Sequence, residues 1–338
     1  MDKETKYYNA LNLLYQSDYL KLKKAKERFS NWESAWQPEK NKSKDADQEW
    51  QRLENLNIRL ILKKDKIFPP LLKEISWPPF GLYALGNISY QRPALAIVGT
   101  RNATPLGKEL ARSFAQSLAR TGLTIISGLA LGVDESAHRG ALDANGKTIA
   151  VLGTALDNLY PKQNEGLAKN ILESGGAIIS EYPPNQEYHP QNFLIRNRLI
   201  SGLADGVLII EAPEKSGALA TAKFALEQNR EIFVIPGNIK AQNYKGSNAL
   251  IKAGATPVTE PEDILNYFGI TIKSRLEKSI AGLNQLENEI IQSLQNNQLT
   301  PEQILENTKI NFSELNKNLA MLVIKGIIKE SNGKYYLS

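Results

Sequence analysis

The sequence predicts an α/β protein with a doubly wound, mostly parallel β-sheet at its centre. Short runs rich in Val, Ile and Ala alternate with helical segments over residues 92–268. Most runs are continuous in their apolar character, as expected for parallel strands that are buried on both faces. Helices with clear end signals separate the runs, so the repeating unit is a strand followed by a helix.

The first part of the chain, residues 1–66, is expected to be a small helical domain. Four apolar side chains recur with helical spacing and form one face: Tyr7, Leu11, Leu14 and Tyr15. The charged stretch that follows, residues 38–49, is expected to be a linker or an exposed turn. Prolines at 69–70 and 78–79 then end any helix, because each lacks a backbone N–H.

The central domain, residues 67–270, carries the predicted sheet. Its strands are expected at residues 95–98, 124–126, 148–152, 177–179, 207–210 and 232–235. Asp134 is expected to cap the helix after the second strand, and Asn145-Gly146 to close it. Gly175-Gly176 is expected to close the next helix.

A polar stretch, residues 271–284, is expected to be a linker to a third domain at residues 285–338. The sequence predicts helices at 286–294, 300–307 and 313–325, then strands at 327–330 and 335–337. The turn between these strands contains Asn332-Gly333, which favours a tight hairpin. Three helices followed by a hairpin are typical of a winged-helix domain.

The composition excludes several kinds of site. The chain of 338 residues has no cysteine, which rules out a disulfide scaffold, a thiolate zinc site and a cysteine nucleophile. With only two histidines, His138 and His189, a histidine-based metal site is not expected. We therefore expect no metal and no other cofactor.

Charge and hydropathy point to a cytoplasmic protein without a membrane partner. The first ten residues are polar and lack the apolar core of a signal peptide. No stretch approaches the roughly 18 apolar residues of a membrane span. The net charge of +5 and the pI of about 9.0 permit a nucleic-acid partner, although a mildly basic surface is often only solvated.

The first loop after a predicted strand, residues 97–104, has the composition of a phosphate site. Ligands of open α/β sheets bind beyond the carboxyl ends of the strands. Gly99 lets the backbone turn tightly, Thr100 offers a hydroxyl group, and Arg101 offers a fork of donors. The next helix would direct its N–H groups to the same place. The alternative is a structural turn with a surface arginine.

The second loop leads to Asp134 and His138, four residues apart on one predicted helix. Such a pair can act as acid and base in an enzyme. No nucleophile is visible beside them, which favours a structural interpretation: a helix cap and a hydrogen-bonded histidine.

The third segment contains Phe193, Arg196 and Arg198. Phe193 and Arg196 share roughly one helix face, whereas the two arginines point to different sides. An aromatic ring can stack on a base while a guanidinium holds the backbone, which is the chemistry of single-strand binding. The alternative places Phe193 in the core and pairs the arginines with Glu181 or Glu211.

A fourth loop contains Lys215, Ser216 and Gly217 and opens another helix, which would form a second anion site. Several successive strand ends thus carry glycines, hydroxyl groups and basic residues. One nucleotide needs only one such loop. A run of them suits a nucleic-acid backbone that crosses the edge of the sheet.

Together these residues resemble the DNA-processing protein A family, also called Smf. The matching stretches are residues 97–104, 127–142, 150–153 with 157 and 160–161, 179–181, 193–198, 211–212, 216–217 with 221–222, and 236–237 with 254–255. The resemblance implies an extended Rossmann-like core and a sterile-alpha-motif-like N-terminal domain. It also implies a protein that is not an enzyme.

The resemblance further implies sequence-independent binding of single-stranded DNA. It implies loading of RecA recombinase onto DNA covered by single-strand binding protein, in natural transformation and homologous recombination. The residues it places at the DNA are Gly99, Thr100, Arg101, Phe193, Arg196, Arg198, Lys215, Ser216 and Gly217. It implies a homodimer through residues 249–255, where Leu250 and Ile251 are the expected contacts.

The alternative function is enzymatic: a nucleoside-monophosphate phosphoribohydrolase of the lysine-decarboxylase-like Rossmann group. That group carries a Pro-Gly-Gly-x-Gly-Thr motif followed by a glutamate. The corresponding stretch here, residues 215–221, lacks the motif, so the sequence favours the binding function.

Overall fold

The computed structural model describes residues 3–42, 45–90, 92–270, 283–294, 298–308, 310–324, 327–331 and 333–337. The chain divides into two compact units, Met1–Phe268 and Gly269–Ser338. The predicted linker at 271–284 lies largely outside the described residues.

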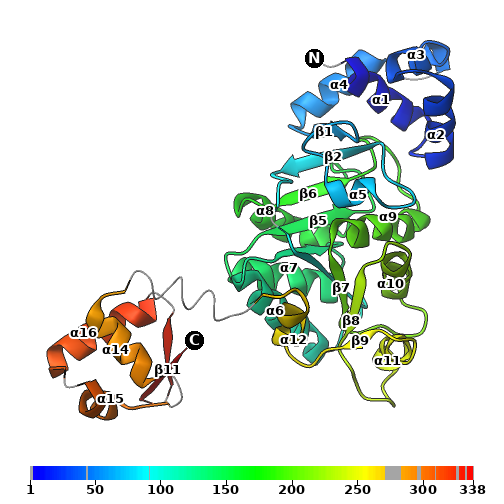
Figure 1. Ribbon diagram of the computed structural model, residues 1–338. Coiled ribbons are helices and arrows are strands. Elements are labelled where there is room, and N and C mark those ends of the chain that lie inside the picture. Colours follow the sequence, from blue (N-terminus) through cyan, green and yellow to red (C-terminus); the bar gives the residue numbers. More distant parts are fainter. Residues whose placement is uncertain are drawn as a thin grey trace. The chain divides into compact units, whose positions relative to one another are not determined.

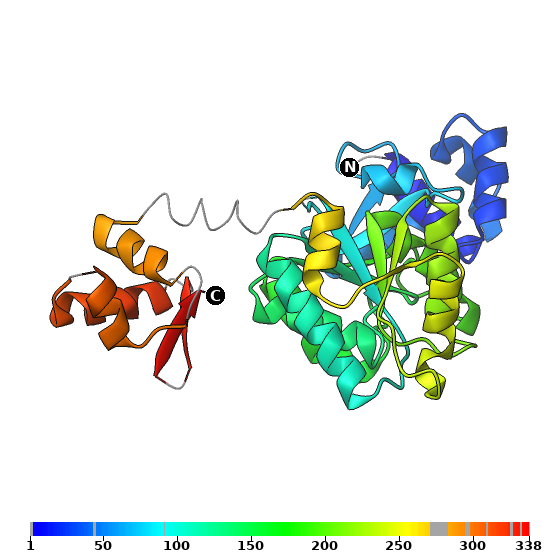
Figure 2. The same cartoon turned by 60° about the horizontal axis from the view of Figure 1, so that its bottom comes forward.

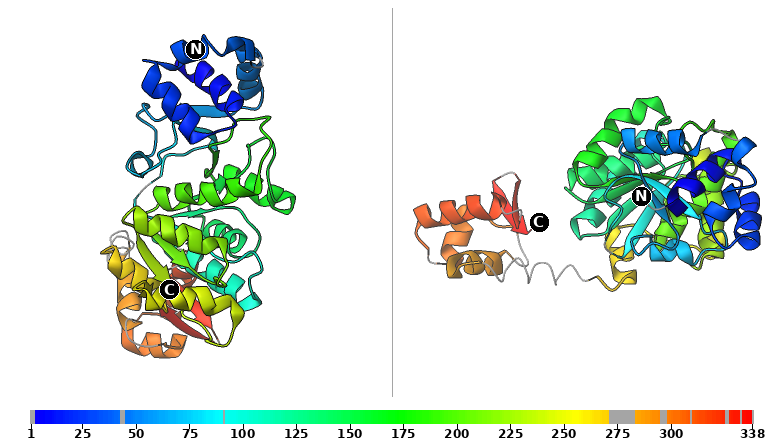
Figure 3. Two further views of the ribbon diagram at one scale, coloured as in Figure 1. Left: turned by 90° about the vertical axis from the view of Figure 1, so that its right-hand side faces the viewer. Right: turned by 90° about the horizontal axis from the view of Figure 1, so that it is seen from above.

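The first unit begins with a group of helices, drawn in blue in Figures 1 and 3. They are α1 (Lys3–Leu14), α2 (Tyr19–Arg28), α3 (Trp32–Trp36), the 3-10 turn η1 (Lys40–Lys42) and α4 (Ala46–Asn55). The helix is confirmed, and the four residues of the predicted face pack in one cluster with Trp32 and Trp36. Burial is not limited to that face, because residues 8–13 are all buried. The expected linker at residues 38–49 is wrong in its second half. There Asp45 caps α4, and the helix buries one face in spite of its charged composition.

The sheet of the first unit has nine strands in the order β1-β2-β6-β5-β4-β3-β7-β8-β9. They are β1 (Arg59–Leu62), β2 (Gly81–Gly86), β3 (Ala94–Val98), β4 (Thr124–Ser127), β5 (Thr148–Leu152), β6 (Ala177–Ser180), β7 (Gly206–Ile209), β8 (Glu231–Val234) and β9 (Thr256–Pro257). All pairs from β6 to β9 are parallel, whereas β1 and β2 pair antiparallel at one edge. The six predicted strands are confirmed, whereas β1, β2 and β9 were not predicted.

Helices cover both faces of the sheet, as a doubly wound fold requires (Figure 2). They are α5 (Pro70–Lys73), α6 (Pro105–Arg120), α7 (Val133–Asp143), α8 (Glu165–Glu173), α9 (Pro190–Leu203), α10 (Gly217–Glu227), α11 (Lys245–Lys252) and α12 (Pro261–Tyr267), with 3-10 turns η2 (Lys162–Asn164) and η3 (Gln242–Tyr244). Helices α6, α7 and α8 form one layer, while α9 and α10 pack together in the other.

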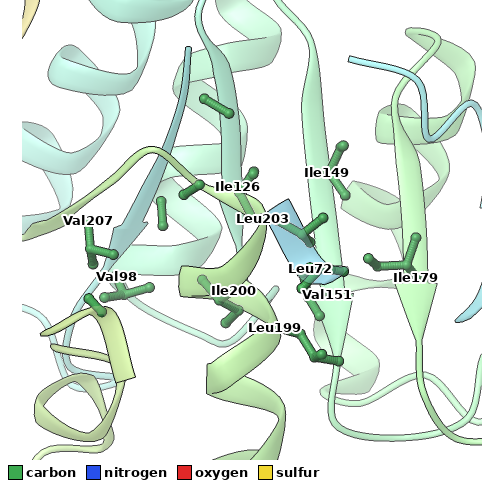
Figure 4. Packing of buried hydrophobic residues seen from close by; sticks show 14 of the residues in the cluster. Leu72, Val98, Ile126, Ile149, Val151, Ile179, Leu199, Ile200, Leu203 and Val207 are labelled. Atoms are coloured by element: carbon green, nitrogen blue, oxygen red, sulfur yellow. The ribbon is translucent and has the colours of Figure 1, made fainter. Parts of the chain in front are cut away.

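Helix α9 is held by a core of aliphatic side chains (Figure 4). Its residues Leu199, Ile200 and Leu203 pack against Val151 and Val207 of the sheet, within one buried cluster. Burial of a side chain of this size stabilises the fold by about 1.5–3 kcal/mol. The N-terminal half of α9 is thereby fixed above the carboxyl ends of the strands.

Two of the three predicted helix-end signals are confirmed. Asn145 has a positive φ of 50°, and the Gly146 N–H donates to the Ala141 carbonyl at 2.9 Å. At the end of α8, Gly176 closes the helix with an equivalent bond to Ile171, also 2.9 Å. The expected cap at Asp134 is wrong, because α7 starts two residues earlier than such a cap requires and its N-cap is Gly132.

The second unit contains α14 (Gln285–Ser293), α15 (Pro301–Thr308) and α16 (Phe312–Ile324), followed by the antiparallel pair β10 (Ile328–Ser331) and β11 (Lys334–Leu337). The predicted order of three helices and a hairpin is confirmed, and its assignment as a winged helix stays a prediction. None of the helices in the described part of the chain has the length and apolar character of a membrane span.

Candidate functional site

The candidate site lies where β3 and β7 end. Val98 is in register with Ile209, so the loops that follow these strands begin side by side. The order of the chain reverses here, because β4, β5 and β6 lie on one side of β3 while β7, β8 and β9 lie on the other. Ligands of open α/β sheets bind at such a switch point. The structure has a cavity of about 570 Å³ at this place.

The loop from β3 to α6 forms one wall of the cavity. Gly99 has no room for a side chain, because a Cβ there would lie 2.9 Å from the backbone oxygen of Glu211. The Thr100 N–H donates to the same oxygen at 2.7 Å, which fixes the loop to the end of β7. The Arg101 side chain is exposed, and its guanidinium lies 5.3 Å from the centroid of the Phe193 ring.

A buried carboxylate, Glu211, holds this loop in place. Its Oε2 accepts hydrogen bonds from the Thr104 N–H and from the Asn243 side-chain amide, both at 3.0 Å. Thr104 is also the N-cap of α6, where its hydroxyl oxygen accepts from the Gly107 N–H at 3.0 Å. The positive end of the α6 dipole therefore lies next to the Gly99–Arg101 wall.

The loop from β4 to α7 approaches the first loop closely at Gly132. This residue has φ +83°, and a Cβ there would lie 2.6 Å from the backbone oxygens of Thr100 and Arg101. Asp134 follows and lines the cavity. Its carboxylate accepts from the Gly128 N–H at 3.1 Å, and burial raises the pKa of this group.

His138 is not among the residues that line the cavity. Its buried ring places Nδ1 2.7 Å from the Thr148 hydroxyl oxygen. That hydroxyl donates to the Ile125 carbonyl at 2.8 Å, so the imidazole Nδ1–H must be the donor in the first bond. Burial lowers the pKa of His138 to about 3. The geometry supports the structural interpretation of His138 as a hydrogen-bonded histidine, whereas Asp134 bonds to Gly128 and does not cap the helix.

Helix α9 turns its two arginines in different directions. Arg196 lines the cavity but is only 4% exposed. Its Nη1 donates to the Gly128 carbonyl at 2.9 Å and also to the Val151 carbonyl. Burial lowers the pKa of its guanidinium to about 10, so the group is a cation at neutral pH. Arg196 connects α9 to the β4–α7 loop and carries its charge beside Asp134.

Arg198 lies outside the cavity. It is 2% exposed and forms a buried ion pair with Glu181, which follows β6. This is one of the two pairings that the sequence left open; no pairing of Arg196 or Arg198 with Glu211 occurs in the described residues. Eight of the nine residues expected at one pocket do line it: Gly99, Thr100, Arg101, Phe193, Arg196, Lys215, Ser216 and Gly217.

The loop from β7 to α10 forms the opposite wall. Ser216 is the N-cap of α10, and its hydroxyl oxygen accepts from the Ala218 N–H at 3.2 Å. The Gly217 carbonyl accepts from the Asn197 amide of α9 at 3.1 Å, which joins the two helices. Lys215 is exposed beside them. A second helix N-terminus and a second exposed cation therefore border the cavity.

Three aromatic rings form one rim of the cavity. Tyr160, Tyr188 and Phe193 lie 5.5–5.8 Å apart between ring centroids, and the tyrosines are 41% and 39% exposed. Neither tyrosine was predicted to belong to the site. Tyr188 lies five residues before Phe193, whereas Tyr160 comes from the distant segment between β5 and η2. Exposed rings of this kind offer flat faces for stacking.

The charge of the cavity suits an anion. The charged residues in its lining are the cations Arg101, Arg196 and Lys215 and the single carboxylate Asp134. Three positive charges against one leave a net excess of two, and Arg196 already offsets the carboxylate. The fold and the site thus define a class: α/β proteins with a cationic cavity at the switch point of the sheet, where open sheets of this kind bind their ligands.

Comparison with known proteins identifies the family. The chain matches the family described as DNA recombination-mediator protein A over residues 59–269, and it belongs to that family. Protein Smf of Escherichia coli is 44% identical over 224 residues, which cover 64% of this chain and 59% of that protein. The chain therefore matches less than two thirds of that relative's length.

Two solved structures are similar to this one. The X-ray structure of DNA processing protein A from Streptococcus pneumoniae has a TM-score of 0.60 at 37% identity and covers 65% of this chain and 76% of the other. A structure of the protein from Helicobacter pylori, described by its unique single-stranded DNA binding mode, has a TM-score of 0.56 at 32% identity. It covers 62% of this chain and 95% of the other. The extended, mostly parallel Rossmann-like core is thus shared with this family.

Proposed function

We propose that this chain binds single-stranded DNA in the cavity at the ends of β3 and β7, without strong sequence preference. The observation that carries the proposal is the meeting of two exposed cations, Arg101 and Lys215, with the rings of Tyr160, Tyr188 and Phe193 in one open cavity. The cations and the helix N-termini suit phosphates. The rings suit bases, and stacking accepts every base.

We further propose that the bound strand is passed to RecA recombinase, on DNA that is otherwise covered by single-strand binding protein. The function served would be natural transformation and homologous recombination. Membership of the recombination-mediator family and the single-stranded DNA binding described for the Helicobacter pylori relative support this proposal. Such a role needs no catalytic group, in keeping with a buried His138 that serves only the fold.

We also propose a homodimer through α11. Leu250 and Ile251 are both half-buried and pack against the main core cluster, so each keeps part of its surface for a partner. An isologous contact would join two copies of this patch, and one strand could then engage two cavities. Light scattering on the Ile251→Glu variant tests the interface. A folded monomer supports the dimer contact, whereas a folded dimer contradicts it.

The function is tested by fluorescence anisotropy with oligothymidylate, beside an assay for release of adenine from AMP. We expect tight binding that weakens linearly on a log–log plot as salt rises, because phosphate contacts release counterions. We expect no release of adenine. Adenine release without strand binding would instead favour the phosphoribohydrolase.

A further inference from the structure

A second surface with the chemistry of single-strand binding lies on the N-terminal helices. Helix α2 has the sequence YLKLKKAKER, with five cations against one carboxylate. Leu22 and Ala25 are its buried residues, so the lysines and Arg28 lie on the exposed sides. Cations at this density on a short helix attract a phosphate backbone.

Exposed aromatic rings adjoin these cations. The Tyr19 ring, at the start of α2, stacks on Trp77 with centroids 6.3 Å apart and planes 19° apart. Trp77 is 54% exposed, which is unusual for so large an apolar side chain. Tyr19 also stacks on Phe80 at 5.3 Å. An open tryptophan face beside several lysines has the two elements that sequence-independent strand binding requires.

A second basic segment is bonded to the backbone of one of these aromatic residues. Residues 63–66, which follow β1, contain three lysines, and the Lys63 N–H donates to the Phe80 carbonyl at 2.9 Å. Two carboxylates lie near lysines of α2, Asp18 at 3.9 Å from Lys21 and Glu27 at 3.8 Å from Lys23, so five cations against one carboxylate of the helix and Asp18 still leave a positive excess. Basic residues thus occur both on α2, which carries Tyr19, and in the segment bonded to the backbone of Phe80.

This surface is joined directly to the cavity at β3 and β7. The Ser17 hydroxyl donates to the Gln186 side-chain oxygen at 2.7 Å, and the Asn12 amide donates to the Glu181 carbonyl at 3.1 Å. Gln186 is two residues from Tyr188 of the cavity rim, and Ser17 is two residues from Tyr19. Two residues span at most about 7 Å, so the two sets of rings are close enough for one strand.

We propose that the strand held in the cavity continues past Tyr188 onto a second contact surface, formed by Tyr19, Trp77 and the cations of α2. The proposal rests on the proposed function and extends it. The second surface lengthens the site on each protein molecule and takes the phosphates and bases that leave the cavity. Single-strand sites of about 4–16 nucleotides per domain are common, and two adjoining surfaces fit that length.

The test compares a short oligothymidylate of about six nucleotides with a long one of about twenty. For Trp77→Ala we expect about tenfold weaker binding of the long strand, the effect of losing one stacked base, and unchanged binding of the short one. The matched control is Leu20→Ala, which removes an exposed apolar side chain of α2, next to Tyr19, without removing a ring.

A double charge reversal, Lys23→Glu with Lys24→Glu, tests the cations and changes only exposed positions. We expect weaker binding of the long strand. We also expect the slope of the log binding constant against log salt concentration to be smaller in magnitude by about one to two, because the variant neutralises fewer phosphates and releases fewer counterions. The control with the same change of net charge is Arg120→Glu with Lys169→Glu, on α6 and α8.

The outcomes separate the two proposals. Failure of the wild-type protein to bind either strand would contradict the proposed function itself. Normal binding of both strands by the folded α2 and Trp77 variants would overturn only the second surface. Equal losses on short and long strands would also overturn it, because the variants would then act through the cavity.

Discussion

Two arginines of the cavity, Arg101 on the loop after β3 and Arg196 on α9, have opposite surroundings. Arg101 is exposed, contacts the Phe193 ring and has no carboxylate within ion-pair distance among the described residues. Arg196, across the same cavity, is buried and bonded to two backbone carbonyls. Its neighbour Arg198 is buried in an ion pair. Residue type alone thus does not define a phosphate contact: the exposed cation is available to a ligand, whereas the buried ones hold loops in place.

The largest effect that we expect from this comparison is a fall in the free energy of unfolding of the Arg196→Met variant. The change removes the bonds to the Gly128 and Val151 carbonyls and leaves the buried Asp134 without its cation. Two buried carbonyls left without their donor, at about 1–3 kcal/mol each, should together cost about 2–6 kcal/mol. Urea unfolding should show this loss in the free energy of unfolding. A variant that unfolds like wild type but fails to bind DNA would place Arg196 among the ligand contacts instead.

The exposed Arg101 should show the reverse behaviour, a loss of binding without a loss of stability. We expect Arg101→Ala to weaken binding of oligothymidylate by about 1.5–3 kcal/mol, the value of a charge-assisted hydrogen bond, with the free energy of unfolding unchanged. Lys169→Ala, an exposed lysine on α8, is the control for loss of one positive charge. Wild-type affinity of the Arg101 variant at both low and moderate salt would exclude the phosphate role.

Much of this arrangement follows from the sequence, and for clear physical reasons. Strands buried on both faces give continuous apolar runs, so all six central strands were predictable. The loops after them were predictable as one site, because the carboxyl ends of parallel strands share an edge. Strands β1 and β2 were missed because they form the antiparallel border of the sheet, and short runs in a proline-containing stretch do not stand out.

The burial of the arginines was not predictable in the same way. The spacing of Arg196 and Arg198 showed that they point to different sides of α9, but their partners come from distant segments. Glu181 and Gly128 are brought to them only by the packing of the sheet. Tyr160 was missed for the same reason, whereas Tyr188 lies only five residues before Phe193 but outside α9, so helical spacing did not indicate it.

The Phe193→Ala variant tests whether the ring on the exposed wall contacts a base. We expect a loss of about 1–3 kcal/mol in binding free energy, as for one stacked base, with a cooperative unfolding transition retained. Phe193 is half-buried and packs against Gly153, where a Cβ would lie 2.8 Å from the ring. A large drop in melting temperature with normal binding by the folded fraction would instead assign Phe193 to the core. Phe193→Tyr is the matched control, because it keeps the ring.

The smallest expected effect concerns His138, a buried group that serves only the fold. Its pKa is lowered to about 3 in the folded protein, against about 6.5 in the unfolded chain. Below about pH 6.5 the unfolded state takes up a proton that the folded state refuses, so the free energy of unfolding falls as the pH falls. From pH 6.5 to 5.5 this group should cost about 1 kcal/mol.

The His138→Asn variant isolates this contribution. An asparagine amide can keep the hydrogen bond to Thr148 but does not titrate, so the variant should lose less stability than wild type over that pH range. His189 and the buried Asp134 are present in both proteins, and their effects cancel in the difference. The measurement is the free energy of unfolding in urea at both pH values, beside DNA binding, which should not differ between the two proteins. Parallel pH profiles would show that the imidazole takes up its proton in the folded state as well. The assignment of His138 to a purely structural interior would then be wrong.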